Sequence, residues 1–266
     1  MQYQIPAHVL PRAPSTKPSQ HNLQFHHETS PFAFWITRST GEVIFDTRPE
    51  NIPVHTEFIE RNGKVLRDSG TPAYPLVFSD QYLQLATAVP NNTNIYGLGE
   101  IIATDGIRIN NGTIVTFWNR DSGGSPADEN LYGSHPFYLE TRYDESAHSL
   151  SHGVFMMNSH GMDVLIRSGL VEYRILGGTL DMYFLSGPTP KAVVEQYSDV
   201  VGKPAKMPFW AFGFHMCRWK HRWSTLDGVR EVVEQMKKEN IPLETVWSDL
   251  DYMDRYRDFT VNDDFR

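Results

Sequence analysis

The stretch Phe209-Trp-Ala-Phe-Gly-Phe214 is a continuous apolar run, which predicts a strand buried on both faces. A polar loop follows it, and then a helical pattern that Ser224 caps with Asp227 three residues later. The apolar face of this helix is formed by Val229, Val232, Val233 and Met236, and the pattern ends at Asn240 and Pro242. A second β-rich run, Glu244-Thr-Val-Trp-Ser248, comes next. This order of strand, helix and strand predicts a βαβ unit with a right-handed crossover.

Short β-rich runs fill the sequence upstream of this unit. Phe32-Ala-Phe-Trp-Ile-Thr37 and Glu42-Val-Ile-Phe-Asp46 flank a glycine-containing turn, the pattern of a hairpin. Further runs lie at 82–88, 113–118, 136–142, 153–157, 162–167, 171–176 and 180–185. This many short strands predicts an antiparallel β-sandwich. The first thirty residues lack periodicity, and we expect a surface segment or a strand remnant there.

Two features mark the organisation of this predicted sandwich. Residues 119–134 are too many for a hairpin turn and too polar for a core, and loops of this length are usually functional. At Thr189 the apolar period changes from two to 3.6, which predicts a closing helix over 190–201 that Gly202 ends. We therefore expect a sandwich domain over 1–207 and a βαβ unit over 208–266.

Composition excludes several classes of function. The 266 residues carry 24 basic and 32 acidic side chains, and the net charge of −8 with dispersed Lys and Arg predicts no nucleic-acid partner. No apolar run reaches the length of a membrane span, and the first residues do not resemble a signal peptide. Cys217 is the only cysteine, so we expect neither an internal disulfide nor a thiolate metal cluster. The tripeptides at 91–93 and 111–113 match the N-glycosylation sequon, a short pattern that also arises by chance.

Candidate chemistry lies where the two predicted strands end. Asp249 and Asp251 follow the second strand one residue apart, and we expect both to point to the same side. Alternatively, one of them bonds loop amides or pairs with Arg255 or Arg257. A third interpretation is the Asp-Leu-Asp metal motif of nucleotide-sugar transferases, although no phosphate-cradling loop accompanies it. Trp219 follows the first strand and could stack on a sugar face.

Other familiar site patterns are absent. His215 and His221 have neither helical spacing nor a neighbouring ligand, so we predict no metal site. Gly97-Leu-Gly99 lacks the third glycine of a dinucleotide fingerprint, and we predict no cofactor. Cys217 has no base evidently paired with it, which argues against a nucleophilic role.

Several short motifs follow one another in order along the chain. They are Ile95-Tyr-Gly-Leu-Gly-Glu100, Phe117-Trp-Asn-Arg-Asp121, Leu131-Tyr-Gly-Ser-His-Pro-Phe-Tyr-Leu139, Gly153-Val-Phe-Met-Met-Asn158, Gly187-Pro-Thr-Pro190, Phe214-His-Met-Cys-Arg-Trp219 and Trp247-Ser-Asp-Leu-Asp-Tyr-Met-Asp254. In order and spacing the chain resembles glycoside hydrolase family 31, the α-glucosidase family. The resemblance implies a galactose-mutarotase-like sandwich whose long loop reaches over the mouth of a catalytic (β/α)8 TIM barrel.

The resemblance also implies which residues bind substrate. By matched motif, Asp121 would hydrogen-bond sugar near the +1 subsite, and Trp219 and Leu250 would line the pocket. Asp249 would hold hydroxyl groups of the non-reducing glucose in subsite −1. A buried carboxylate that accepts two sugar hydroxyls rejects other epimers, because a misplaced hydroxyl leaves it unpaired. The implied ligand is an α-glucoside or malto-oligosaccharide.

The family's reaction is hydrolysis with retention, which needs a carboxylate nucleophile and a carboxylic acid roughly 5–5.5 Å apart. In the family both lie on later barrel strands, in motifs without a counterpart here. We therefore expect no catalytic residue in this chain, which alone would be an inactive fragment with the C-terminal part of the barrel as its partner. Alternatives are a non-catalytic carbohydrate-binding relic and a fragment of an α-xylosidase.

Two departures from the family pattern accompany the resemblance. Lys220-His221 stands where the family usually has Gly-Tyr. The resemblance therefore does not specify how the +1 side of the pocket is formed. The family's domain normally begins upstream of the segment 4–11, so we expect truncation at both ends. By resemblance alone, the protein would belong to the secretory pathway.

Overall fold

The protein divides into two compact units, Met1–Gly202 and Lys203–Arg266. The computed structural model describes residues 22–53, 59–61, 64–66, 76–91, 93–143, 148–217, 219 and 225–266. Three sequence features, the segment 4–11, the dipeptide Lys220-His221 and the proposed cap Ser224, lie outside the described residues. The domain boundary expected between residues 207 and 208 stays a prediction.

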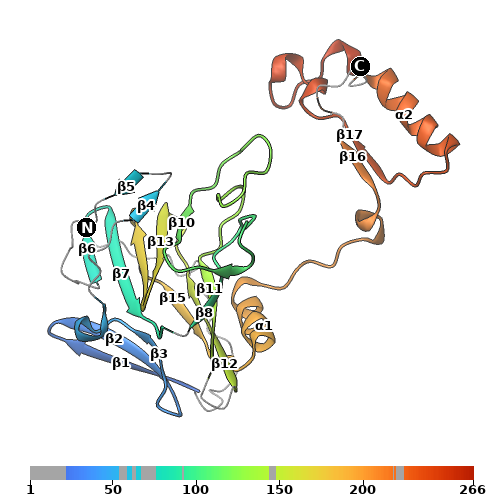
Figure 1. Cartoon of the computed structure of the whole chain (residues 1–266). Helices are drawn as coiled ribbons and strands as arrows, with labels where there is room; N and C mark the ends of the chain where they lie inside the picture. The colour runs from blue at the N-terminus through green and yellow to red at the C-terminus, as the bar shows by residue number, and fades with distance from the viewer. Residues whose placement is uncertain are drawn as a thin grey trace, which may run out of the picture. The chain divides into compact units, whose positions relative to one another are not determined.

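The first unit is built from antiparallel sheets, shown in Figure 1. One five-stranded sheet has the order β10 (Ile114–Phe117), β13 (Met162–Arg167), β14 (Leu170–Ile175), β7 (Tyr82–Ala88) and β6 (Leu76–Ser79). The other has the order β15 (Met182–Leu185), β12 (Ser149–Met156), β11 (Phe137–Tyr143), β8 (Asn94–Gly97) and β9 (Arg108–Ile109). The smaller sheets are β1 (Leu23–Thr29), β2 (Phe32–Arg38) and β3 (Val43–Asp46), and the pair β4 (Ile59–Arg61) and β5 (Lys64–Leu66). The predicted mainly-β antiparallel architecture is confirmed.

The hairpin expected at 32–46 is present as β2 and β3, with a register shift between Ile36 and Thr37. The short 3-10 helix η1 (Pro49–Asn51) follows it. Residues 23–29 differ from the expectation, because they form the full strand β1, paired with β2 along its length. Backbone pairing stabilises this strand although its sequence is polar, so hydrophobic periodicity did not reveal it.

Strand β11 shows how the sheets divide the core. Tyr138 lies in the main hydrophobic cluster with Tyr173 and Phe45, whereas its neighbours Phe137 and Leu139 belong to a second cluster. Successive side chains of a strand point to opposite faces, so both faces of β11 are covered. Strand β11 is therefore a buried strand rather than a half-exposed one.

Helix α1 (Pro190–Val201) covers the second face of this sheet. Thr189 caps it by accepting a hydrogen bond from the Ala192 amide, and Gly202 ends it at a φ of 97°, a conformation that favours glycine. Tyr197 stacks on Phe137 with ring centroids 4.3 Å apart. The helix covers the same residues as the one predicted from the sequence.

Two tyrosine hydroxyls lie in the main core, those of Tyr138 and Tyr173, and neither has a hydrogen-bond partner among the described residues. Burial raises the pKa of both phenols above the ordinary value. Above about pH 10, the ordinary tyrosine pKa, these two tyrosines ionise in the unfolded chain but stay protonated in the folded protein. Stability is therefore independent of their titration below about pH 10 and falls as the pH rises above it.

We expect Tyr173→Phe to raise the free energy of unfolding by about 1 kcal/mol at pH 8, because it removes an unsatisfied buried hydroxyl. We also expect a shallower loss of stability above about pH 10. Urea midpoints at pH 8 and pH 10.5 measure both effects, with Tyr143→Phe, at a half-exposed position, as the matched control. A variant that is as sensitive to alkaline pH as the parent would contradict this interpretation.

The second unit contains a parallel strand pair joined by a helix. Strand β16 (His215–Cys217) pairs in parallel with β17 (Thr245–Trp247), and helix α2 (Leu226–Lys238) connects them. Three 3-10 helices follow, η3 (Leu250–Tyr252), η4 (Asp254–Tyr256) and η5 (Asp263–Phe265). The predicted order of strand, helix and strand is confirmed.

Two details of the predicted βαβ unit are wrong. Residues 209–214 do not form a strand: Phe209–Phe212 is the 3-10 helix η2, and β16 begins only at His215. A continuous apolar run forms a strand only where its two faces are covered, whereas Phe209 and Phe212 are 93% and 75% exposed in this unit. The α2 cap is Thr225, whose side chain accepts from the Gly228 amide, and not Ser224.

Candidate functional site

The long loop over residues 119–134 joins β10 to β11 and contains neither helix nor strand. Its base is held by Asn130, which is buried with 7% of its surface exposed. The Asn130 side chain accepts a hydrogen bond from the Trp118 amide at 2.9 Å and donates one to the Gly133 carbonyl at 2.7 Å. Sequence reasoning missed this residue, because one asparagine in a polar loop carries no distinctive signal.

Further contacts brace the loop along its length. The Arg120 amide donates to the Leu131 carbonyl at 2.8 Å, and the Arg120 side chain pairs with Glu129. Asp128 accepts hydrogen bonds from the amide and the hydroxyl of Thr104, which lower the pKa of this carboxyl group. The loop is therefore a folded segment with defined internal contacts.

We expect Asn130→Ala to destabilise the loop by about 1–3 kcal/mol, because it removes the buried side chain that bonds both the Trp118 amide and the Gly133 carbonyl. Hydrogen exchange over residues 118–134 measures the effect, and the exchange rates should rise there with little change in β13 and β14. Ser125→Ala, at an exposed position on the same loop, is the control. Unchanged exchange in Asn130→Ala would show that Asn130 does not hold the loop.

Asp121, the residue of this loop that is predicted to bind sugar, is exposed. The hydroxyl group of Tyr132 donates to Asp121 Oδ1 at 2.6 Å, and this hydrogen bond together with the carboxylate charge raises the pKa of Tyr132. Among the described residues, the second carboxylate oxygen of Asp121 has no hydrogen-bond partner. Tyr132 therefore orients Asp121 and leaves one oxygen able to accept a hydrogen bond from a ligand.

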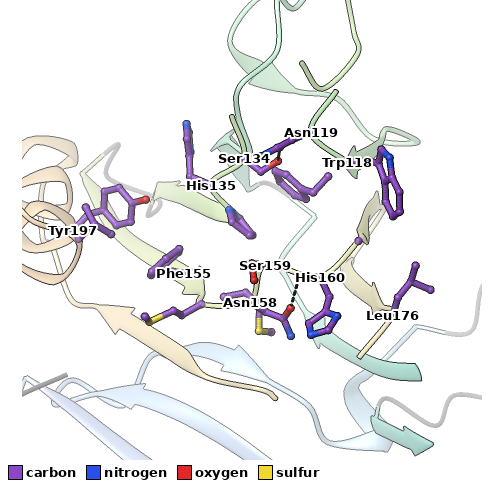
Figure 2. Close-up of a pocket in the computed structure, with 16 residues that line it drawn as sticks. Trp118, Asn119, Ser134, His135, Phe155, Asn158, Ser159, His160, Leu176 and Tyr197 are labelled. Atoms are coloured by element: carbon purple, nitrogen blue, oxygen red, sulfur yellow. Dashed lines mark hydrogen bonds between the residues drawn. The ribbon is translucent and has the colours of Figure 1, made fainter. Parts of the chain in front are cut away.

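A cavity of about 890 Å³ lies beside the ends of the loop, shown in Figure 2. Trp118, Asn119, Ser134 and His135 line one part of it, and Tyr197 of α1 lines another. The segment from Phe155 to Gly161 and the side chain of Leu176 line a further part of it. The size and the apolar and aromatic character are typical of ligand pockets. Asp121 is not among the lining residues in the described part of the chain.

In the second unit, Asp249 follows β17 and caps η3. Its Oδ1 accepts from the Leu250 amide at 2.7 Å, and the Cys217 thiol donates to Oδ2 at 3.4 Å. Trp219 and Leu250 are 53% and 42% exposed. The parallel pairing of β16 with β17 thus brings Cys217, the last residue of β16, close to Asp249, which follows β17.

The premise for a common orientation of Asp249 and Asp251, that both continue a strand, is wrong. Asp249 is the N-cap of η3 and Asp251 lies inside this 3-10 helix, so the alternation of a strand does not apply to them. The alternative interpretation is correct for Asp249, which bonds a loop amide. The ion pairs given for Arg255 and Arg257 in the described part of the chain are both with Asp254.

The four sequence-predicted site residues are divided between the two units. Asp121 lies in the first, and Trp219, Asp249 and Leu250 lie in the second. Within the described residues there is no cluster of three or more His, Cys, Asp or Glu side chains arranged to hold a metal ion. No helix in the described part of the chain is long and apolar enough to cross a membrane.

Comparison with known families covers both units. Residues 3–164 match the glycosyl hydrolase 31 N-terminal galactose mutarotase-like domain, and residues 204–266 match the glycosyl hydrolases family 31 TIM-barrel domain. The chain belongs to glycoside hydrolase family 31. The first unit is thus the family 31 mutarotase-like β-sandwich, and the second is the start of the family 31 TIM barrel.

Several family 31 relatives are similar over nearly the whole chain. A probable alpha/beta-glucosidase of Arthroderma benhamiae is 43% identical, over 98% of this chain and 28% of the relative. An alpha-glucosidase of Schizosaccharomyces pombe is 40% identical, over 94% of this chain and 25% of the relative. An alpha-glucosidase of Hordeum vulgare is 40% identical, over 92% of this chain and 24% of the relative. The chain spans about a quarter of the length of these relatives.

Solved family 31 structures share the fold. A Flavobacterium johnsoniae GH31 dextranase complexed with isomaltotriose matches 90% of this chain and 26% of its own, with a TM-score of 0.65 and 20% identity. A family 31 alpha-glucosidase from Bacteroides thetaiotaomicron matches 68% of this chain and 30% of its own, with a TM-score of 0.58 and 28% identity.

Proposed function

We propose that this chain is the sugar-recognition part of a retaining α-glucosidase that removes terminal non-reducing α-linked glucose from malto-oligosaccharides. The observation that carries the proposal is the similarity, at 37–43% identity, to proteins named as glucosidases over both units of the chain. A relic that only bound carbohydrate would be free to diverge in the motifs of one unit, whereas here both units match their family models.

In this proposal Asp249 accepts hydroxyl groups of the glucose in subsite −1. The Leu250 amide and the Cys217 thiol each donate a hydrogen bond to the Asp249 carboxylate. These two bonds hold the carboxylate in one orientation before a ligand binds. Fixed acceptors favour the epimer whose hydroxyls meet them and disfavour others, because an unmatched buried acceptor is costly. Trp219 and Leu250 present partly exposed apolar surface on which a sugar ring can pack.

Asp121 is proposed to bind sugar near the +1 side, held in position by Tyr132. We place no nucleophile and no general acid in this chain, because the family motifs that carry them have no counterpart in its sequence. The bond-breaking carboxylates, about 5–5.5 Å apart in a retaining enzyme, would then belong to the remaining part of the barrel. That part is the proposed partner of these residues.

A chimeric enzyme tests the proposed function. This chain replaces the matching quarter of the S. pombe alpha-glucosidase, to which it is 40% identical. We expect a folded chimera that hydrolyses maltose and releases glucose with retained configuration, and that prefers an aryl α-glucoside to the corresponding α-xyloside. Preference for the xyloside would favour an α-xylosidase, and a folded but inactive chimera would favour a binding relic.

A further inference from the structure

A sequence motif outside the sugar site occupies the turn between β9 and β10. Asn111-Gly112-Thr113 matches the sequon for N-linked glycosylation, in which a hydroxyl residue follows the acceptor asparagine by two positions. Asn111 and Gly112 are exposed. Among the described residues, the Asn111 side chain makes no hydrogen bond, so its amide nitrogen is free to be modified.

The backbone of this turn is fixed even though its tip is open. The Gly112 amide donates to the Ile166 carbonyl at 2.8 Å, and the Ile166 amide donates to the Thr113 carbonyl at 2.9 Å. Gly112 has a φ of +88°, and a Cβ atom placed on it would meet no atom within 4 Å. The turn is therefore attached to β13 at its base and faces open space at Gly112, so a bulky group at the neighbouring asparagine has room.

The second sequon, Asn91-Asn92-Thr93, has a different environment. Asn91 Oδ1 accepts a hydrogen bond from the Ser168 hydroxyl at 3.3 Å. The hydroxyl group of Thr93 donates to Glu140, whose side chain is fully buried. Both the acceptor residue and the required hydroxyl are thus engaged by the fold, which ties this tripeptide to its surroundings.

We propose that Asn111, and not Asn91, is an attachment site for an N-linked oligosaccharide. The donor is an oligosaccharide carried on a lipid pyrophosphate. In the transfer, Asn111 Nδ2 forms a bond to the anomeric carbon of the sugar, and the bond from that carbon to the pyrophosphate oxygen breaks. The lipid pyrophosphate leaves with the electron pair, and Nδ2 gives up one proton.

The position gives such a glycan a physical role. Strands β9 and β10, which the turn connects, are edge strands of the two five-stranded sheets. Exposed edges can pair with other chains, and proteins cover them with polar or bulky features. A hydrophilic glycan on Asn111 would shield both edges at the point where they meet.

Expression in a yeast host behind a cleavable signal sequence tests the proposal, with the chain recovered from both cells and medium. We expect one glycan, seen as a mobility shift that peptide-N-glycosidase removes. Digestion in ¹⁸O-labelled water should place the label on Asn111, which distinguishes enzymatic glycan removal from spontaneous deamidation at the Asn-Gly bond during expression.

Sequon variants provide the controls. Asn111→Gln and Thr113→Ala should both abolish the shift, whereas Thr113→Ser, which keeps a hydroxyl, should retain it. Asn110→Gln, a neighbouring asparagine outside any sequon, and Asn91→Gln should also retain the shift. An unmodified chain in both fractions would overturn the proposal, as would a shift that Asn91→Gln removes and Asn111→Gln does not.

Discussion

In the chimeric α-glucosidase, Asp249→Ala should lower kcat/KM for maltose by about 10³-fold or more, because a site built to bond sugar hydroxyls loses its acceptor. Asp249 is the only predicted site residue whose two carboxylate oxygens are both positioned by local donors, the Leu250 amide and the Cys217 thiol, within the described residues. Steady-state kinetics with maltose and with an aryl α-glucoside measure the effect.

Asp251→Ala is the matched control for this variant, since Asp251 lies two residues along the chain, inside η3. We expect it to retain activity within about tenfold of the parent chimera, because the proposal gives Asp251 no contact with sugar. Equal losses in Asp249→Ala and Asp251→Ala would indicate damage to η3, and full activity in Asp249→Ala would remove Asp249 from the site.

Glu140→Ala should have the largest effect on stability, a loss of about 3–5 kcal/mol in the free energy of unfolding, because it leaves the buried Arg142 guanidinium without its main partner. Glu140 Oε1 lies 2.5 Å from Arg142 Nε, and its Oε2 lies 3.0 Å from His152 Nε2. Arg142 continues the network by donating to the Val43 carbonyl at 2.6 Å, which joins the β2–β3 hairpin to β11. Chemical denaturation of the whole chain measures the loss.

An exposed ion pair provides the control for Glu140→Ala. Glu129→Ala removes the partner of Arg120, and with both side chains about half exposed it should change stability by at most about 1 kcal/mol. A similar effect of the two substitutions would show that burial does not set the strength of the Glu140 network.

The same carboxylate predicts a response to acid. Burial alone would raise the pKa of Glu140, but the contact with His152 and the charge of Arg142 outweigh it and lower the pKa to about 2. Because the folded-state pKa is depressed, the contribution of Glu140 is complete above the unfolded value near 4.5 and is lost as pH falls towards 2. Glu140→Gln should flatten the fall in stability across this range.

Much of the fold follows from periodicity. Alternating residues in β7 and β13 predicted both strands with their observed ends, and the change of period at Thr189 predicted α1 because cap, proline and terminal glycine agree there. The same reasoning failed for residues 209–214, since apolar content alone does not specify a strand in a unit that leaves those side chains exposed.

The candidate site was predictable only in part. Motif spacing identified Asp121, Trp219, Asp249 and Leu250, and their roles stay predictions. The contacts that hold them were not predictable: Tyr132 meets Asp121 across a loop, and Cys217 meets Asp249 through the pairing of two strands. Such contacts depend on tertiary arrangement, which a pattern in one sequence does not specify.

Assay of the purified 266-residue chain with p-nitrophenyl α-glucoside tests most directly the claim that recognition lies in these residues and bond breaking lies elsewhere. The account predicts no release of p-nitrophenol above the uncatalysed rate, in a preparation whose circular dichroism shows a folded β protein. Turnover by this chain alone, lost in Asp249→Ala and absent from a mock purification, would contradict it.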